Sequence, residues 1–365
     1  MLAKKFHSLL AIFVLILGLI VVFHGINTVH KSASRVPTSP ASPTKMNLFP
    51  SPSPVSIRIS TLFVPYWNCK DGDTATYQRT IYFGLTPSLS GINTTDDGYT
   101  NLKKCLPLLS STATRLLTLR MLNAEQNAAI LKSKTAQEKI ISDTIDETQS
   151  NGFSGIALDI EFTDYLHTDT PDLLSAFVHD FATEAHAKHL SLTFITYGDT
   201  FYRKRPIDLQ TIAPKVDEVM VMAYDFHKVN GLPGPNFPLG GNDKYGYDMK
   251  EMADDFLAAV PAEKLTVIFG MYGYDWTVDE TKKPIKGAKS QTDLQIQEKY
   301  IDTCKSSNCV IRTDDESAET EIDFVDSTSM YHIVWFENNS SVQRKERFLQ
   351  QKGIGSFAFW ANGYF

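Results

Sequence analysis

Short apolar runs alternate with longer amphipathic stretches along most of the chain. The runs are rich in β-branched and aromatic residues and predict eight strands, at 57–67, 79–84, 115–121, 155–162, 191–197, 218–224, 265–272 and 355–360. Most of the intervals have helical spacing, as over 135–150 and 171–189. This alternation predicts an α/β fold, a (β/α)8 or TIM barrel. A doubly wound sheet would also alternate, but no glycine-rich phosphate turn follows the first strand.

The interval between the seventh and eighth predicted strands is longer than one helical connection requires. It spans about 80 residues, whereas most connections in compact domains take only a few residues beyond their helix. We therefore expect a small insertion between strands 7 and 8, at about 277–340. A helix over 341–351 is then predicted to lead into the last strand.

The N-terminal residues follow a different pattern. Lys4 and Lys5 precede an apolar run over 9–23, which is typical of an export or anchoring segment. No small-residue cleavage site closes the run, so we expect residues 1–27 to form a transmembrane signal anchor. Residues 28–56 are rich in Ser, Thr and Pro and predict an extended linker. The body, 57–365, would then face the cell envelope, or be secreted if a peptidase removes the first segment.

Charge and cysteine content narrow the function classes. The chain carries 42 acidic and 35 basic side chains, for a net charge of −7, so no broad cationic surface for nucleic acid is expected. We expect the chain to act as a monomer. Four cysteines in an exported protein permit disulfides. Cys304 with Cys309 and Cys69 with Cys105 is one possible pairing, and the sequence leaves the pairing open.

Two carboxylates on the fourth predicted strand are the strongest candidates for catalysis. Because side chains alternate along a strand, Ala157, Asp159 and Glu161 share one face, and the opposite face is apolar. The carboxylates should therefore point inward near the carboxyl end of the strand, which is the active face of a TIM barrel. An ion pair with a neighbouring Arg or Lys is the structural alternative. Two close carboxylates share protons, which suits a general acid. We predict that Glu161 donates the proton and that Asp159 supports it.

The sixth predicted strand supplies polar partners for these carboxylates. Alternation places Met222 and Tyr224 on one side of it, with Asp225 where the strand ends. A tyrosine hydroxyl suits a carboxamide oxygen, and an aspartate suits sugar hydroxyls or an amide N–H. We expect Tyr224 and Asp225 to meet Glu161 across the barrel mouth.

Aromatic residues gather at the predicted strand ends. Flat rings commonly line carbohydrate clefts because sugar rings have apolar C–H faces. Each aromatic by itself is more often part of a hydrophobic core, but tryptophans at three strand ends favour a cleft, with Trp360 as its floor. The residues concerned are Tyr66, Trp67, Tyr272, Tyr274, Trp276, Phe359 and Trp360.

These motifs resemble glycoside hydrolase family 18, the chitinase family. The fourth strand of that family carries Asp-x-x-Asp-x-Asp-x-Glu, and the matching positions here are Ser154, Ala157, Asp159 and Glu161. The stretch 222–225, Met-Ala-Tyr-Asp, matches the Met-x-Tyr-Asp element of the sixth strand. Trp360 matches the tryptophan of the eighth strand, and 270–276 is similar to the branch that contains bacterial spore-cortex and peptidoglycan N-acetylglucosaminidases.

The resemblance implies roles for the matching residues. Glu161 would be the acid/base and Asp159 would orient the 2-acetamido group of the substrate, with Tyr224 and Asp225 as its binding partners. Met222, Trp67, Tyr272 and Trp360 complete the expected substrate site. The reaction would be substrate-assisted hydrolysis of β-1,4-linked N-acetylglucosamine polymers, in peptidoglycan or chitin, with no metal or other cofactor.

Two departures from the family motif leave alternatives open. Ser154 and Ala157 replace aspartates, and the second of these normally shares a proton with the residue at the position of Asp159. Their loss is compatible with a non-catalytic, lectin-like barrel that binds carbohydrate. A metal-dependent barrel enzyme with Asp159, Glu161 and Asp225 as magnesium ligands is a third alternative.

Overall fold

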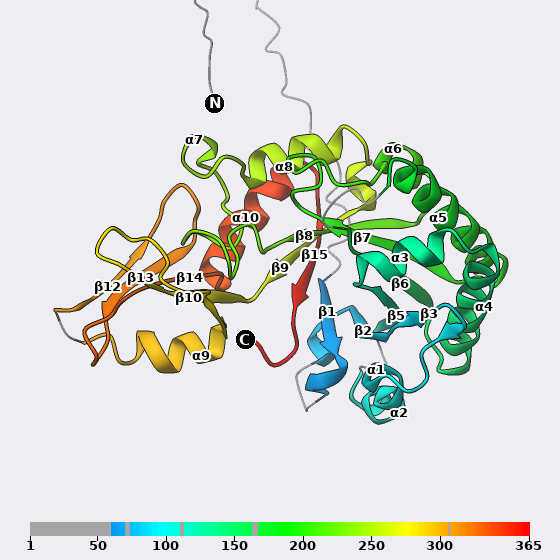
Figure 1. The fold of residues 1–365 in the computed structure, drawn as a ribbon, viewed down its shortest axis with the longest axis horizontal. Coiled ribbons are helices and arrows are strands. Elements are labelled where there is room, and N and C mark those ends of the chain that lie inside the picture. The colour runs from blue at the N-terminus through cyan, green and yellow to red at the C-terminus, as the bar shows by residue number, and fades with distance from the viewer. Residues whose placement is uncertain (1–59, 70–73, 110–112, 163–166, 306) are drawn as a thin grey trace, which may run out of the picture. The chain divides into compact units, whose positions relative to one another are not determined.

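A computed structural model describes residues 60–69, 74–109, 113–162, 167–305 and 307–365 (Figure 1). The predicted signal anchor, 1–27, and linker, 28–56, lie outside these ranges. Among the helices that are described, none is both long and apolar enough to cross a membrane.

Eight parallel strands close into a barrel, as the sequence predicts, in the order β1-β15-β9-β8-β7-β6-β5-β2 (Figure 1). All eight predicted strands are confirmed, with bounds that differ by a few residues. The barrel strands are β1 (Ser60–Pro65), β2 (Arg79–Leu85), β5 (Thr114–Met121), β6 (Gly155–Ile160), β7 (Ser191–Tyr197), β8 (Glu218–Ala223), β9 (Leu265–Gly270) and β15 (Ser356–Trp360).

Helices cover much of the outside of the barrel, and α4 and α5 lie side by side there (Figure 1). Local signals set their ends: the Ser133 hydroxyl caps α4, and Pro171 lies in the first turn of α5. The helices here are α1 (Asp97–Thr100), α2 (Leu102–Cys105), α3 (Ala124–Leu131), α4 (Lys134–Ser150), α5 (Thr170–Ala187), α6 (Leu209–Ile212), α7 (Asn242–Tyr245), α8 (Met249–Leu257) and α10 (Asn339–Gln351). A two-stranded ribbon, β3 (Pro87–Ser88) and β4 (Gly91–Ile92), packs near α4.

Alternation along the strands divides the core into two layers. Ile156, Leu158 and Ile160 of β6 pack in the large cluster between strands and helices. Ala157 packs instead inside the barrel, with residues from all eight strands. This inner cluster comprises Phe63, Ile81, Phe83, Leu116, Ala157, Ile195, Met220, Met222, Ile268, Ala358 and Ala361.

The amino end of the barrel is closed by a paired charge. Arg79 at the start of β2 donates two hydrogen bonds, each 2.7 Å, to the carboxylate of Glu218 at the start of β8. The hydroxyls of Thr193 and Thr266 also donate to Glu218, and that of Thr61 accepts from Arg79. Both charges are thus compensated within the barrel.

A second sheet is inserted between β9 and β15, the interval in which the sequence predicts an insertion. Its five strands are antiparallel, in the order β11-β10-β14-β13-β12. The chain enters it directly after β9, because Tyr272 already belongs to β10. The inserted elements are β10 (Tyr272–Val278), β11 (Lys289–Thr292), α9 (Asp293–Ile296), a π-helical turn (Gln297–Ile301), β12 (Cys309–Thr313), β13 (Thr320–Val325) and β14 (Tyr331–Phe336).

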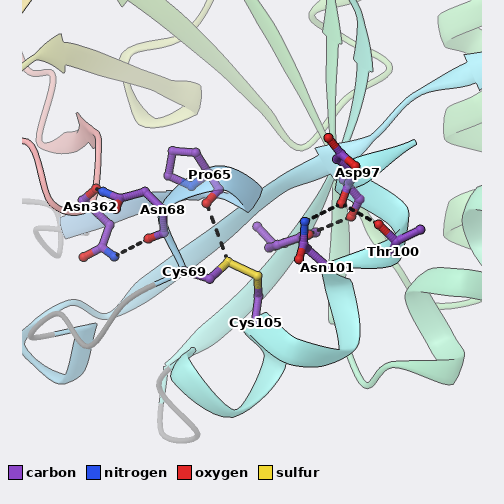
Figure 2. The surroundings of a disulfide bond; sticks show 10 residues. Pro65, Asn68, Cys69, Asp97, Thr100, Asn101, Cys105 and Asn362 are labelled. Atoms are coloured by element: carbon purple, nitrogen blue, oxygen red, sulfur yellow. Dashed lines mark hydrogen bonds between the residues drawn. A yellow bond between two sulfur atoms is a disulfide. The ribbon is translucent and has the colours of Figure 1, made fainter. Parts of the chain in front are cut away.

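Two disulfides fasten loops of this framework. Cys304 and Cys309 close a short loop before β12, and Cys69 and Cys105 join the turn after β1 to α2 (Figure 2). The same turn is also bound to the C-terminal segment. The side-chain amide of Asn68 donates to the backbone carbonyl of Asn362, and the side-chain amide of Asn362 donates to the backbone carbonyl of Asn68 (Figure 2). The turn that carries Trp67 is therefore fixed to α2 and to the C-terminal segment.

Candidate active site

The carboxyl end of β6 brings two carboxylates to the barrel mouth. Asp159 is the fifth residue of β6 and is 3% exposed. Glu161 follows the strand, and its backbone N–H donates to the Met121 carbonyl at the end of β5, which keeps it in register. Ala157 on the same face packs inside the barrel, so Asp159 lies above that cluster. The inward orientation predicted for these side chains is confirmed.

Burial governs the protonation of Asp159. Desolvation raises the pKa of Asp159 well above its usual value, and the neighbouring Glu161 charge raises this pKa further. Arg120 on β5, paired in register with Asp159, lowers the pKa, but the salt bridge of Arg120 is to Asp96 at 2.9 Å. Asp159 Oδ1 is buried without a hydrogen-bond partner among the described residues. The ion-pair alternative for this side chain is therefore not supported.

Glu161 is held by a tyrosine that the sequence analysis missed. The hydroxyl of Tyr197, the last residue of β7, donates to Glu161 Oε2 at 2.7 Å. The guanidinium of Arg205 lies over the face of the Tyr197 ring, 4.0 Å from the ring centroid, and helps to hold the ring in place. Burial raises the pKa of Glu161, and the charge of Asp225 raises this pKa further. The hydrogen bond from Tyr197 and the charges of Lys228 and Arg205 lower the pKa in part. Glu161 thus tends to retain a proton while keeping a fixed orientation.

The end of β8 places Tyr224 and Asp225 beside the carboxylates. Burial raises the pKa of Tyr224 well above its usual value, and the charges of Asp159 and Glu161 add to the shift. Tyr224 therefore remains a neutral hydrogen-bond donor. Oδ1 of Asp225 accepts hydrogen bonds from the hydroxyls of Tyr272, at 2.5 Å, and Tyr274, at 2.7 Å. Two residues of the inserted sheet thus complete a site that the barrel begins.

Asp225 adopts a left-handed backbone, with φ of 58°, where the strand alternation ends. Aspartate tolerates this region better than most residues. The Asn236 side chain stabilises the turn: its Oδ1 accepts from the Asp225 N–H at 2.8 Å, and its Nδ2 donates to the carbonyls of Gly270 and Tyr272. The backbone N–H of Asn236 donates to buried Glu319, which is in a salt bridge with Lys345 of α10. A continuous polar network thus connects α10 with the site.

Aromatic rings line the mouth on the side of β1, β2 and β15. The ring centroid of Trp360 lies 4.7 Å from that of Phe83, 5.6 Å from Phe63 and 6.0 Å from Trp67. Trp67 is 48% exposed and lies on the turn fixed by Cys69 and Asn68. The rings of Trp360 and Trp67 thus lie together next to the inner cluster, to which Trp360 is also packed.

Most of the residues predicted for the site lie near one another, and two of the wider aromatic set do not line it. Met222 is buried in the inner cluster below Tyr224, and Tyr272 reaches Asp225 from β10. Trp276, in contrast, is fully buried in the inserted sheet, because the chain continues into β10 where the sequence suggests a strand end. Phe359 packs with the outer cluster of the barrel.

An open cavity adjoins Asp225. It has a volume of about 580 Å³ and is lined mainly by the loop after β8. Aromatic rings and two cationic side chains form much of its wall. The lining residues include Tyr202, Arg203, Phe226, His227, Lys228, Tyr245 and Tyr274.

Comparison with known proteins agrees with this geometry. The model of glycosyl hydrolases family 18 matches residues 123–364. The chain belongs to this family. The match covers β6 with Asp159 and Glu161, the end of β8 with Tyr224 and Asp225, and β15 with Trp360.

Relatives within the family include enzymes of the spore cortex. The cortical fragment-lytic enzyme of Bacillus anthracis is 24% identical over 247 residues, which cover 66% of this chain and 54% of that protein. The chain thus spans about half the length of the curated relatives it matches first. The crystal structure of the Bacillus cereus spore cortex-lytic enzyme SleL has a TM-score of 0.69 at 19% identity, covering 84% of this chain and 71% of that one. Human YKL-39, described as a pseudo-chitinase with retained chitooligosaccharide binding, has a TM-score of 0.70 at 14% identity. The match covers 84% of this chain and 92% of the YKL-39 chain.

Proposed function

We propose that this chain hydrolyses β-1,4-linked N-acetylglucosamine polymers, in peptidoglycan or chitin, with Glu161 as the acid/base. The observation that carries the proposal is the pair Asp159 and Glu161 on one inward face at the barrel mouth, with neither carboxylate in a salt bridge among the described residues. Charge compensation would suppress proton transfer, and burial without a cation favours it. Membership of family 18 supports the same chemistry.

In the proposed mechanism, the substrate supplies its own nucleophile. Glu161 protonates the glycosidic oxygen while the 2-acetamido oxygen of the sugar attacks the anomeric carbon of that sugar. The bond from the anomeric carbon to the leaving oxygen breaks, and the leaving sugar departs with the proton. The Glu161 carboxylate then accepts a proton from water as the water oxygen attacks the anomeric carbon, and the bond between this carbon and the acetamido oxygen breaks, which regenerates the acetamido group. The configuration at this carbon is retained after two inversions.

The surrounding residues orient the acetamido group. Asp159 Oδ1, buried and without a partner among the described residues, is suited to accept the acetamido N–H and to stabilise the charge that develops there. The neutral Tyr224 hydroxyl is suited to donate to the acetamido oxygen, and Asp225 to accept from a sugar hydroxyl. Trp360, packed on Phe63 and Phe83, would form the floor under the sugar ring.

The proposed location of the protein is based on the N-terminal sequence and the relatives. Residues 1–27 have the pattern of a signal anchor and 28–56 that of a linker. We propose that they hold the catalytic barrel in the cell envelope, where peptidoglycan is within reach. The relative from Bacillus anthracis, named for lysis of cortical fragments, supports an envelope substrate.

A single substitution tests the acid assignment. Glu161→Gln in the full chain should lower the release of reducing ends from purified peptidoglycan and chitin by about 100- to 10,000-fold, because the amide has no proton to donate. Glu263→Gln, an exposed residue just before β9, is the matched control and should leave the rate unchanged. Equal rates for Glu161→Gln and wild type would contradict the assignment. Saccharide binding by the wild type, without cleavage after long incubation, would favour the lectin-like alternative.

A further inference from the structure

The cavity beside Asp225 lies at the end of the mouth farthest from β2. In the closed order of eight strands, β8 lies four strands from β2, so the cavity and the Trp67 and Phe83 rings are on opposite sides of the mouth. Glu161 at the end of β6 lies between these sides. A saccharide that crossed the mouth from Trp67 to this cavity would therefore pass Glu161.

The wall of this cavity contains two cationic side chains, Arg203 and Lys228, and one carboxylate, Asp225, which is a formal excess of one positive charge. The carboxylate of Asp199 is shared by two guanidinium groups, Arg203 and Arg205, each at 2.9 Å. Lys228, exposed on the loop after β8, forms no salt bridge among the described residues, and its charge reaches Glu161, whose pKa it lowers. The whole chain has a net charge of −7, so this cationic wall is a local departure.

The other titratable groups of the cavity do not cancel this charge. Burial lowers the pKa of His227, and its Nδ1 lies 2.8 Å from the Pro235 carbonyl oxygen, so the ring is neutral at pH 7. Asp225 is the one carboxylate of the wall among the described residues, and its Oδ1 is occupied by the hydroxyls of Tyr272 and Tyr274. An anionic group on the substrate would thus meet Lys228, which is in no salt bridge among the described residues, and Arg203, which is paired with Asp199, against the single carboxylate of Asp225.

We propose that this cavity recognises a carboxylate on the sugar next to the cleaved bond. Chitin is neutral, whereas the muramic acid residues of peptidoglycan carry a carboxylate, either on the lactyl ether or on the attached stem peptide. Lys228 contacts this carboxylate, Arg203 adds to the attraction, and the rings of Tyr202 and Tyr245 hold the sugar or peptide. The inference rests on the proposed function and narrows its substrate to the anionic glycan of peptidoglycan.

The test compares three substrates with the full chain and its Lys228→Met variant. The substrates are a tetrasaccharide of alternating N-acetylglucosamine and N-acetylmuramic acid, the same glycan with stem peptides, and chitotetraose. We expect the ratio of kcat/KM for a muramyl substrate to kcat/KM for chitotetraose to fall about tenfold in Lys228→Met, as for the loss of one charge-assisted contact. A change in the pKa of Glu161 caused by loss of the Lys228 charge would alter kcat/KM for both substrates alike, so this change cancels in the ratio.

Further variants and substrates make the outcome decisive. Lys228→Arg should restore the ratio, and Lys104→Met, an exposed lysine on α2, should leave it unchanged. A loss with the peptide-free glycan identifies the lactyl carboxylate, and a loss only with the peptide-bearing glycan identifies the stem peptide. An unchanged ratio overturns the inference. If the wild type cleaves none of the three substrates, the proposed function fails. The inference is then tested by the affinity of the wild type and of Lys228→Met for the same saccharides. An affinity for the muramyl saccharides that is no weaker in Lys228→Met overturns the inference.

Discussion

Two buried carboxylate pairs in this protein have opposite surroundings. Asp159 and Glu161 at the barrel mouth lie near cations but are in no salt bridge among the described residues. Glu319 and Glu337, which flank β13 and β14 of the inserted sheet, are fully buried together with Lys345, whose Nζ contacts both carboxylates. Burial raises the pKa of Glu337 to about 7 even so, because one cation does not compensate two carboxylates; Lys345 lowers this pKa and Glu319 raises it.

The difference between the pairs distinguishes the proposed catalytic site from a structural one. At the mouth, the proposed transfer of a proton from Glu161 to a substrate is favoured because no lysine is in a salt bridge with this carboxylate among the described residues. Under the insertion, Lys345 fixes Glu319, which in turn accepts the backbone N–H groups of Asn236 and Phe237. A perturbed pKa alone does not identify an active site; the presence of a bridging cation and access to the mouth decide which pair is which.

Removing the cation should make the structural pair resemble the mouth pair. Lys345→Met leaves two buried carboxylates without a compensating cation, which should lower the free energy of unfolding by about 3–5 kcal/mol. The measurement is urea unfolding of the full chain at pH 7, followed by circular dichroism. Lys352→Met, which breaks the exposed pair with Asp254 at the end of the same helix, is the control and should cost less than about 1 kcal/mol. Equal losses for the two variants would contradict the role of Lys345.

Neutralising Glu337 should change how stability depends on pH. Its pKa is about 7 in the folded chain and 4.5 when unperturbed, so the folded state binds more protons between these values. Glu337 therefore makes the free energy of unfolding fall as pH rises from about 4.5 to about 7, by up to about 3 kcal/mol.

Glu337→Gln mimics the protonated form, so the variant should match the wild type at pH 4.5 and exceed it at pH 8. Urea unfolding at both pH values measures the difference in the free energy of unfolding between Glu337→Gln and the wild type. Contributions from Asp159 and Glu161 are present in both proteins and cancel in this difference. A constant difference at the two pH values would disprove this origin of the slope.

The smallest effect concerns the hydrogen bond that orients the acid at the mouth. Tyr197→Phe removes a donor that lowers the pKa of Glu161, so this pKa should rise and the alkaline limb of the kcat/KM profile should move to higher pH. We expect less than about a tenfold loss at the optimum, in keeping with about 1 kcal/mol for one hydrogen bond. Tyr99→Phe, which removes a hydrogen bond to Glu147 on α4, is the control. A limb that stays in place or moves to lower pH would contradict the role of Tyr197.

Local patterns in the sequence predict the barrel and its reactive strand. The eight strands are visible as apolar runs, and alternation along 155–162 turns Asp159 and Glu161 inward, because neighbouring side chains on a strand must face opposite sides. Met222 and Tyr224 follow from the same rule on β8. These features need no knowledge of distant residues.

Tertiary structure alone decides which distant residues meet these strands. Tyr197 reaches Glu161 from β7, Arg205 of the following loop lies over the Tyr197 ring, and Tyr274 reaches Asp225 from the inserted sheet. Trp276 shows the converse, since a tryptophan near a predicted strand end is buried in another sheet. Sequence periodicity reports which face of an element a residue occupies, but not what lies opposite that face. Contacts between residues far apart in the chain form only when the barrel closes and the insertion folds against it.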